Sequence, residues 1–307
     1  MAEEQRKIAQ KIVPHLWFDG TAEAAAEVYA GLVPGSGIIA VSRFGKAGVD
    51  IHGQPEGRVM TVDFHLGGHR LTALNGGPQF RPTPAVSFFV VFEERAALER
   101  AWTALSKGGR VLMPIDSYQW AERYGWLDDR FGVSWQFALG RRADIGGQTL
   151  APSLLFTGAR AGEAEAAIAH YGSVFSGFRI EGLLRHDGSG PDPEGTVKHA
   201  QFCLAGQTFM AMDSAEAHGF GFSEANSFLV LCDDQAEIDH YWQALSAVPE
   251  AERCGWLKDR FGLSWQIVPS HLPALMSEPE KAERVMAALL EMRKLDIETL
   301  ERAAARA

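Results

Sequence analysis

The sequence lacks the features that mark exported, membrane-spanning or nucleic-acid-binding proteins. Its first residues are charged and lead into a strand-like segment without the apolar stretch of a signal peptide. No apolar run approaches the roughly 20 residues that a spanning helix needs. The 29 Lys and Arg are outnumbered by 39 Asp and Glu, and they form no stripe that would neutralise phosphates. We therefore expect a cytoplasmic protein that binds neither nucleic acid nor membranes.

Cysteine is scarce, and the common signatures of nucleophilic catalysis are missing. Cys203, Cys232 and Cys254 are widely spaced, odd in number and form no Cys-x-x-Cys pair. This pattern is typical of free thiols in a reducing compartment. No Gly-x-Ser-x-Gly segment is present, and no cysteine lies near a histidine in a known catalytic signature. Covalent catalysis is thus thinly supported.

What the sequence does contain is a long internal repeat. Residues 125–136 read Gly-Trp-Leu-Asp-Asp-Arg-Phe-Gly-Val-Ser-Trp-Gln, and ten of these twelve positions recur at 255–266, at an offset of 130. A match of this length indicates a duplication. We divide the chain into a first domain (1–140), a polar linker (141–149), a second domain (150–270) and a helical tail (271–307).

The first half predicts two units in the order strand, helix and three strands. Apolar alternation, helix caps and glycine turns define these elements. The predicted strands are 12–18, 38–44, 59–66, 70–74, 86–92, 110–113, 118–124 and 133–139, with helices at 22–32 and 95–107. The second half repeats this order. Its last unit is ten residues shorter between Leu245 and Gly255 than between Leu105 and Gly125, which predicts the loss of one strand.

The repeated stretch predicts a tight turn followed by a strand. Asp129-Arg-Phe-Gly132 has glycine where a turn needs a positive φ. In the strand that follows, Val133 and Trp135 face one way, while Ser134 and Gln136 face the other. We expect Trp126, Phe131 and Trp135 to belong to the core, and Gln136 and its copy Gln266 to face the hollow of a curved sheet.

These features resemble the vicinal oxygen chelate superfamily, which includes glyoxalase I and extradiol dioxygenases. The repeated stretch, Leu74-Asn-Gly-Gly-Pro78 and the run from His199 to Gly206 are similar to its PhnB-like branch, whose members often carry the label 3-demethylubiquinone-9 3-methyltransferase. The resemblance implies an α+β fold of two tandem domains. Each domain would have two βαβββ units that form a curved mixed sheet around a cleft.

The resemblance also implies where a metal ligand would stand. Catalytic members typically have a metal-binding glutamate four residues after the turn glycine, where this chain has Gln136 and Gln266. His15 lies near the usual histidine position, but its counterpart is Ser153. No copy presents two histidines and a carboxylate at matching positions. A divalent metal cofactor is therefore an open alternative, with His15, Gln136 and His199 as weak candidate ligands.

The methyltransferase label finds little support in the glycine-rich segments. S-adenosylmethionine is commonly held by a glycine turn that leads from a strand into a helix. Gly35-Ser-Gly37 follows a helix and precedes a strand, and Asn75-Gly-Gly-Pro78 opens no helix. We keep methyl transfer as a minor alternative.

We therefore predict a PhnB-like protein that binds a small molecule. The alternative is a metal-dependent enzyme on a small oxygenated substrate, in which the first domain is active through His15, Asp63 or His65, and Gln136. A homodimer is a further possibility. The candidate ligand-binding residues are His15, Trp17, Asp63, His65, Ser87, Gln136, His199, Gln201, Asp213, Ser227 and Gln266.

Overall fold

In the computed structural model, which describes residues 10–306, the first half forms two units with the same order of elements. Unit 1 comprises β1 (Ile12–Phe18), α1 (Ala22–Ala30), β2 (Gly37–Arg43), α2 (Val49–His52), β3 (Val59–Leu66) and β4 (His69–Asn75). Unit 2 comprises β5 (Val86–Phe92), α3 (Arg95–Ser106), β6 (Arg110–Tyr118), β7 (Ala121–Asp128) and β8 (Ser134–Leu139). The strand predicted at 118–124 lies instead at 121–128, because Tyr118 ends β6 and pairs with Ala121 across a hairpin turn.

The second half repeats this order after a short helical turn, η1 (Arg142–Ile145). Unit 3 comprises β9 (Leu150–Phe156), η2 (Gly158–Arg160), α4 (Ala164–Val174), β10 (Arg179–Arg185), β11 (Val197–Leu204) and β12 (Gln207–Asp213). Unit 4 comprises β13 (Asn226–Cys232), α5 (Gln235–Leu245), η3 (Pro249–Ala251), β14 (Trp256–Lys258) and β15 (Ser264–Pro269). Unit 4 thus has three strands where unit 2 has four.

The units form two curved mixed sheets, as the predicted α+β class requires. Sheet A has the order β14-β15-β13-β1-β4-β3-β2, and sheet B has the order β10-β11-β12-β9-β5-β8-β7-β6. Each sheet therefore combines one unit from each half: units 1 and 4 in sheet A, units 2 and 3 in sheet B. The ranges 1–140 and 150–270 describe the repeat in the sequence, but each sheet contains strands from both ranges.

The two units of one half are joined instead through a buried carboxylate. Asp129, in the turn before β8, accepts hydrogen bonds from the backbone N–H groups of Phe131 and Val133, at 2.8 and 3.1 Å. Its second oxygen accepts from the Tyr29 hydroxyl at 2.7 Å and from Trp135 Nε1 at 2.9 Å. Because Tyr29 lies on α1, this carboxylate ties unit 1 to unit 2.

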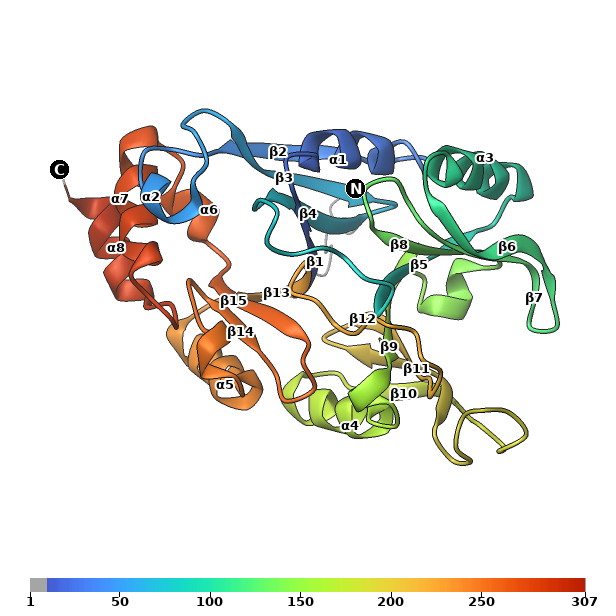
Figure 1. The fold of residues 1–307 in the computed structure, drawn as a ribbon. Helices are drawn as coiled ribbons and strands as arrows, with labels where there is room; N and C mark the ends of the chain where they lie inside the picture. The colour runs from blue at the N-terminus through green and yellow to red at the C-terminus, as the bar shows by residue number, and fades with distance from the viewer. Residues whose placement is uncertain (1–9, 307) are drawn as a thin grey trace, which may run out of the picture.

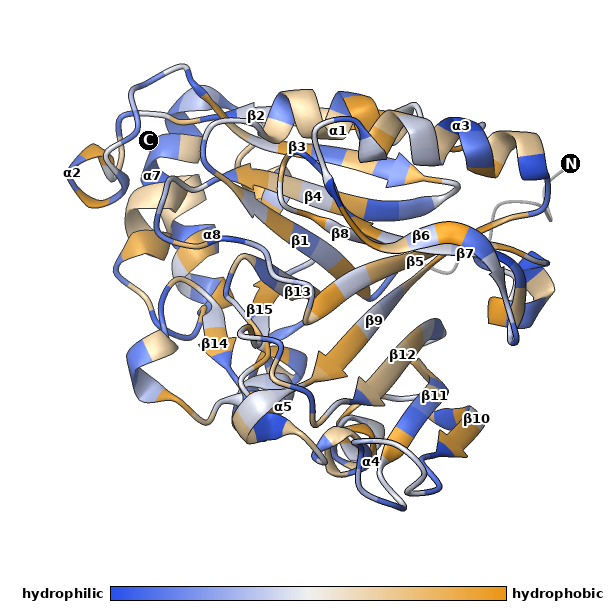
Figure 2. Ribbon diagram, turned by 45° about the vertical axis from the view of Figure 1, so that its right-hand side comes forward, coloured by the Kyte–Doolittle hydropathy of each residue, from blue (hydrophilic) through white to orange (hydrophobic). Residues whose placement is uncertain are grey.

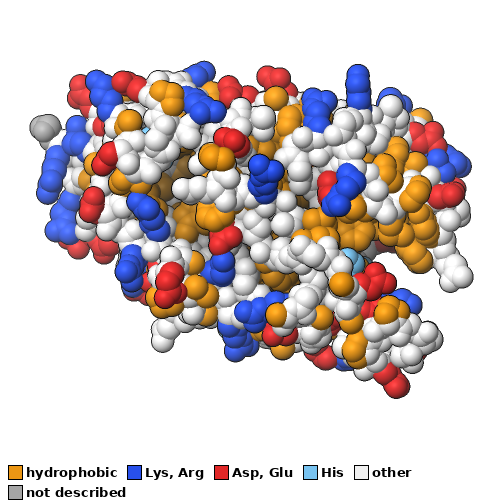
Figure 3. Space-filling view, in the orientation of Figure 1, with side chains coloured by type: hydrophobic (Ala, Val, Ile, Leu, Met, Phe, Trp, Pro, Cys, Tyr) orange, Lys and Arg blue, Asp and Glu red, His pale blue; other side chains and the backbone are white. Residues whose placement is uncertain are grey.

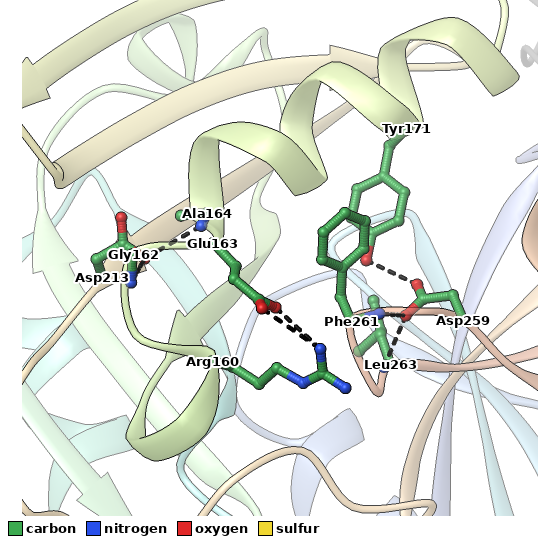
Figure 4. A network of polar contacts seen from close by, with 9 residues as sticks. All are labelled: Arg160, Gly162, Glu163, Ala164, Tyr171, Asp213, Asp259, Phe261 and Leu263. Carbon is green, nitrogen blue, oxygen red and sulfur yellow. Dashed lines mark hydrogen bonds and ion pairs between the residues drawn. The ribbon is translucent and has the colours of Figure 1, made fainter. Parts of the chain in front are cut away.

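The second half contains the same network (Figure 4). As the figure shows, Asp259 accepts from the N–H groups of Phe261 and Leu263 and from the Tyr171 hydroxyl at 2.8 Å. It also accepts from Trp265 Nε1 at 2.9 Å. Burial raises the pKa of Asp259, and four hydrogen bonds to the carboxylate oppose that shift. The repeated Asp-x-x-Gly turn is therefore the link between the units of each half.

Helices α1, α3, α4 and α5 cover one face of the sheets. Helices α1 and α3 lie at one side of the molecule, and α4 and α5 lie at the opposite side (Figure 1). The main apolar cluster lies between these helices and the strands, with Trp135 and Trp265 fully buried in it. Apolar residues concentrate on strands such as β9 and β12 (Figure 2). We call the face of each sheet opposite its helices the inner face.

A tail of three helices packs on the inner face of unit 4. It comprises α6 (Leu272–Leu275), α7 (Pro279–Leu290) and α8 (Ile297–Ala305), all within the range 271–307 predicted to be helical. Val285 and Leu300 pack with Val268 of β15 and its neighbours. The carbonyls of Met292 and Arg293 accept from the N–H groups of Cys254 and Gly255, just before the short edge strand β14. The apolar side chains of the tail therefore pack on this chain.

Two further properties bear on the predicted setting of the protein. Among the described residues, no helix combines the length and apolar character needed to cross a membrane. All three cysteines are free thiols; Cys203 and Cys232 are buried.

Candidate functional site

A row of polar residues crosses the inner face of sheet A. Strand register places Asp63 opposite Thr72, Thr72 opposite His15, His15 opposite Ser227 and Ser227 opposite Ser264. The row therefore runs from β3 to β15 and takes residues from both halves of the sequence. Because successive side chains of a strand alternate between faces, their apolar neighbours, such as Leu16 and Phe64, enter the helix-facing core.

The equivalent row of sheet B has different chemistry. It consists of Gln201, Met210, Ser153, Ser87 and Ser134, again in strand order. These residues occupy the positions that correspond to Asp63, Thr72, His15, Ser227 and Ser264 in sheet A. Of the two rows, only the row of sheet A thus contains an imidazole, a carboxylate and a threonine hydroxyl.

The polar groups at the centre of sheet B satisfy one another. Gln136 Oε1 accepts from the Tyr124 hydroxyl at 2.7 Å, and its Nε2 donates to Ser87 Oγ at 2.7 Å and to Ser153 Oγ at 3.4 Å. Trp126 Nε1 donates to Ser134 Oγ at 2.8 Å. This network leaves little hydrogen-bonding capacity for a ligand at these atoms.

Sheet A is only partly satisfied. Gln266 Nε2 donates to Ser227 Oγ at 3.0 Å, and Asp63 accepts from Thr72 at 2.5 Å and from Arg70 at 2.8 Å. His15 Nδ1 and Ser264 Oγ are buried without a partner among the described residues. The amide of Asn226 is also unpartnered, but the alternation of β13 places it on the core face. Unpartnered buried polar atoms are uncommon and call for an explanation such as a bound ligand or water.

Aromatic side chains surround His15. Trp256 stands edge-on to the His15 ring, with ring centroids 5.6 Å apart, and edge-on to Trp17 at 6.1 Å. Trp17 also contacts Phe80 at 5.1 Å, and its indole Nε1 donates to the Gly77 carbonyl at 2.7 Å. Since the Trp17 indole is held by that bond, it presents a fixed apolar wall beside the imidazole.

The region is electrically neutral near pH 7. Burial lowers the pKa of His15 to about 4, although the negative charge of Asp63 opposes this shift. The imidazole is therefore uncharged, and the Asp63 carboxylate is paired with Arg70. Such a surface favours an uncharged ligand.

The structure divides the predicted site residues between the two sheets. His15, Trp17, Asp63, His65, Ser227 and Gln266 lie on the inner face of sheet A, while Ser87, Gln136, His199 and Gln201 lie on that of sheet B. Grouping His15 with Gln136 in one active domain is therefore wrong. The strand that follows the repeated turn in the first half joins the other sheet, and the glutamine near His15 is Gln266.

Asp213 does not belong to either inner face. It follows Met212 at the end of β12, so its side chain turns toward the helices. One oxygen accepts from the N–H groups of Gly162 and Ala164 at the start of α4, and the other accepts from Val197 N at 2.9 Å (Figure 4). The carboxylate is therefore committed to the N-terminus of α4, and its prediction as a ligand-binding residue is corrected.

The sequence interpretation missed Trp256, Thr72 and Ser264. Trp126 was predicted to be a core residue, yet it is half-buried on an inner face, as is its copy Trp256, whereas Trp135 is in the core as predicted. The signal was available in the alternation of the strand before the turn. Leu127, next to Trp126, is the fully buried residue, so its neighbours face the other way.

The donor set around His15 does not fit a metal centre of the usual kind. His15 is the sole imidazole in its row, Gln266 supplies a neutral amide, and Asp63 is already held by Arg70 and Thr72. Within residues 10–306, no group of three His, Cys, Asp or Glu side chains is placed to hold an ion. First-row metals in proteins usually need more imidazole, thiolate or carboxylate ligands than this.

The glycine turns do not form a nucleotide-type site either. Gly76 and Gly77 follow β4, and the next element is the strand β5. Gly35 lies between α1 and β2. In neither place does a strand lead through glycine into a helix, which is the arrangement that commonly holds the phosphates or ribose of a nucleotide cofactor.

Comparison with a protein family covers most of the chain. A family model described as 3-demethylubiquinone-9 3-methyltransferase matches twice, at residues 10–138 and 148–268. No curated protein matches the chain.

Comparison with solved structures gives relatives of two kinds. A protein from Bacillus cereus, described as a putative 3-demethylubiquinone-9 3-methyltransferase and PhnB protein, is 34% identical over 43% of this chain and 100% of its own, with a TM-score of 0.39. A glyoxalase I mutant from Zea mays is 11% identical over 85% and 94% of the two chains, with a TM-score of 0.50. A putative dioxygenase from Bacillus subtilis is 14% identical over 94% of each chain, also at 0.50. The last two share the fold.

Proposed function

Because the chain belongs to the 3-demethylubiquinone-9 3-methyltransferase family, in the PhnB-like branch of the vicinal oxygen chelate superfamily, we propose that it binds a small uncharged molecule on the inner face of sheet A. The observation that carries this proposal is the pair of buried atoms without partners, His15 Nδ1 and Ser264 Oγ. The aromatic walls of Trp17 and Trp256 beside them support an organic ligand. The free cysteines suit the cytoplasm as its location.

The equivalent face of sheet B supports this choice by contrast. There Tyr124 and Trp126 complete the hydrogen bonds of Gln136 and Ser134. A ligand that bonds to Gln136 or Ser134 would have to break internal bonds of sheet B, where the one unpartnered oxygen nearby, among the described residues, belongs to Asp128, whose other oxygen is paired with Arg110. A ligand on sheet A can form bonds that His15 and Ser264 lack. A polar group that gains its first partner contributes more than one that exchanges partners.

Ligand-observed NMR with a set of uncharged fragments tests the proposal. We expect His15→Ala to abolish the saturation-transfer signals of fragments that bind the wild-type protein. The matched control is Ser153→Ala, which changes the equivalent position of sheet B and should leave those signals in place. Thermal unfolding of each variant verifies that it is folded. Signals that persist in folded His15→Ala protein and disappear in Ser153→Ala protein would move the site to sheet B.

Elemental analysis addresses the metal-dependent alternative. Since the donors around His15 do not complete a metal site, we expect the purified protein to contain no stoichiometric divalent ion. One ion per chain that is lost in His15→Ala protein would favour a metal-dependent enzyme on a small oxygenated substrate.

A further inference from the structure

Trp256 and Trp126 occupy the same backbone position in the two sheets. Trp256 pairs with Gln266 between β14 and β15, and Trp126 pairs with Gln136 between β7 and β8. Two residues after Trp256, β14 pairs with Ser264 of β15; two residues after Trp126, β7 pairs with Ser134 of β8. The backbone of Trp256 therefore has the same position relative to Ser264 as the backbone of Trp126 has relative to Ser134.

The two indoles nevertheless point to different partners. Trp126 Nε1 donates to Ser134 Oγ at 2.8 Å. Trp256 leaves Ser264 Oγ without a partner and stands edge-on to His15 and Trp17 instead. The copy in sheet B thus displays a second indole position that the backbone of sheet A also permits.

The contacts that hold Trp256 in its present position are weak enough to be exchanged. An edge-on aromatic contact and a neutral hydrogen bond contribute similar free energies. His15 explains why the indole differs between the sheets, because sheet B has Ser153 at that position and offers no ring for an indole to contact. Because Trp256 has two edge-on contacts now and would gain one hydrogen bond, its present position is favoured in sheet A, by roughly tenfold in population.

We infer that a planar aromatic ligand of about the size of an indole displaces Trp256 from His15, and that the displaced indole then donates to Ser264 Oγ as Trp126 does to Ser134. This inference rests on the proposed function and names the class of its ligand. The Trp256 indole now fills the space beside His15 and Trp17, so the space that it vacates suits a bicyclic aromatic ring. A hydroxyl group on that ring supplies the partner that His15 Nδ1 lacks.

The surface of the molecule is consistent with a movable side chain here. Trp256 is half-buried and lies on β14, a three-residue strand at the edge of sheet A. Trp126, by contrast, lies on the eight-residue strand β7, which β6 covers on its outer side. Figure 3 shows that hydrophobic side chains gather in hollows of the face drawn there, between charged side chains.

Calorimetric titration with 1-naphthol, an uncharged bicyclic phenol, tests this inference, with the saturated alcohol 1-decalol as the non-planar comparison. Removing the competing indole in Trp256→Ala should tighten naphthol binding about tenfold, because the ligand no longer has to displace it. Ser264→Ala should weaken binding by roughly threefold or more, because the displaced indole loses its acceptor. Trp256→Phe should weaken binding in the same way, since a phenyl ring cannot donate to Ser264.

Ser134→Ala is the matched control in sheet B and should leave naphthol affinity unchanged. In protein that contains 5-fluorotryptophan, naphthol should shift the fluorine resonance that is missing from Trp256→Phe protein. If folded Trp256→Ala protein binds naphthol more weakly, the indole contributes to the binding site instead of blocking it, and the inference is overturned. Unchanged affinity in Ser264→Ala protein would overturn it as well.

The failures of the two proposals are distinguishable. If naphthol binds no variant but other fragments bind in a His15-dependent manner, the aromatic class is wrong and the site on sheet A stands. If naphthol binds equally well to folded His15→Ala protein, the site itself is wrong.

Discussion

The inner faces of sheets A and B have the same strand register, but their polar side chains differ in the hydrogen bonds that they make. In sheet B, the Tyr124 hydroxyl donates a hydrogen bond to Gln136, and the Trp126 indole donates one to Ser134. In sheet A, the residue that corresponds to Tyr124 is Cys254, and the Trp256 indole is turned away from its serine. Two copies of one motif thus differ in their hydrogen bonds because their neighbours differ, although the motif itself is nearly unchanged.

The edges of the two sheets account for much of this difference. Unit 2 retains β6, so β7 is a regular strand that presents Tyr124 and Trp126 to the inner face. Unit 4 lacks the counterpart of β6 among the described residues. There the tail carbonyls of Met292 and Arg293 pair with Cys254 and Gly255 instead. Replacing a strand by the tail leaves β14 short and its tryptophan free to take another position.

The largest effect should come from a feature that the two halves share. We expect Asp129→Ala and Asp259→Ala each to lower the free energy of unfolding by about 3–5 kcal/mol, because each leaves four buried donors without their acceptor. Chemical denaturation measures both. Asp128→Ala, which removes an ion pair to the exposed Arg110, is the control and should cost less than about 1 kcal/mol. Unequal costs for the two aspartates would show that the halves are not equivalent in their cores.

The free energy of unfolding should depend on pH through His15 of sheet A. The pKa of His15 is lowered from 6.5 to about 4 in the folded protein, so between these values the unfolded chain binds a proton that the folded chain does not. Stability should therefore fall as pH falls through this window, by up to about 3 kcal/mol from this residue. His15→Gln should remove that part of the dependence in urea unfolding measured from pH 7 to pH 4. An identical slope in variant and wild type would contradict the burial of a neutral imidazole.

The two glutamines should differ in what they contribute to stability. Gln136→Leu removes partners from Tyr124, Ser87 and Ser153 and should cost about 2 kcal/mol. Gln266→Leu removes one bond, to Ser227, and should cost about 1 kcal/mol or less. Each variant serves as the control for the other in denaturant unfolding. Equal costs would mean that Gln266 has partners that the hydrogen bonds described above do not include.

The smallest contrast concerns the serines beside the tryptophans. Ser134→Ala should cost about 1 kcal/mol, since Trp126 Nε1 loses its acceptor. Ser264→Ala should be close to neutral without ligand, because its hydroxyl has no partner to lose. Thermal unfolding of both variants, with and without 1-naphthol, sharpens the comparison. A clear loss of stability in ligand-free Ser264→Ala protein would indicate that the hydroxyl is already bonded.

Much of the fold could be predicted from local patterns. The repeat at 125–136 and 255–266 revealed the duplication, and the alternation of Ser134, Trp135 and Gln136 correctly assigned faces to β8. The site could be predicted only in pieces. His15, Trp17 and Gln266 were identified as candidates, while Trp256 was missed because a large aromatic residue in a repeated motif resembles a core residue.

The sequence by itself determined the units, since caps, turns and alternation are local and act within a few residues. Tertiary structure alone decided which units share a sheet. Units 1 to 4 present similar strand edges, and backbone hydrogen bonds between strands do not depend on side-chain identity, so nothing local distinguishes pairing within a half from pairing between halves. The same holds for Trp256, whose partner is a histidine that lies 241 residues away in the chain, with the two ring centroids 5.6 Å apart in space.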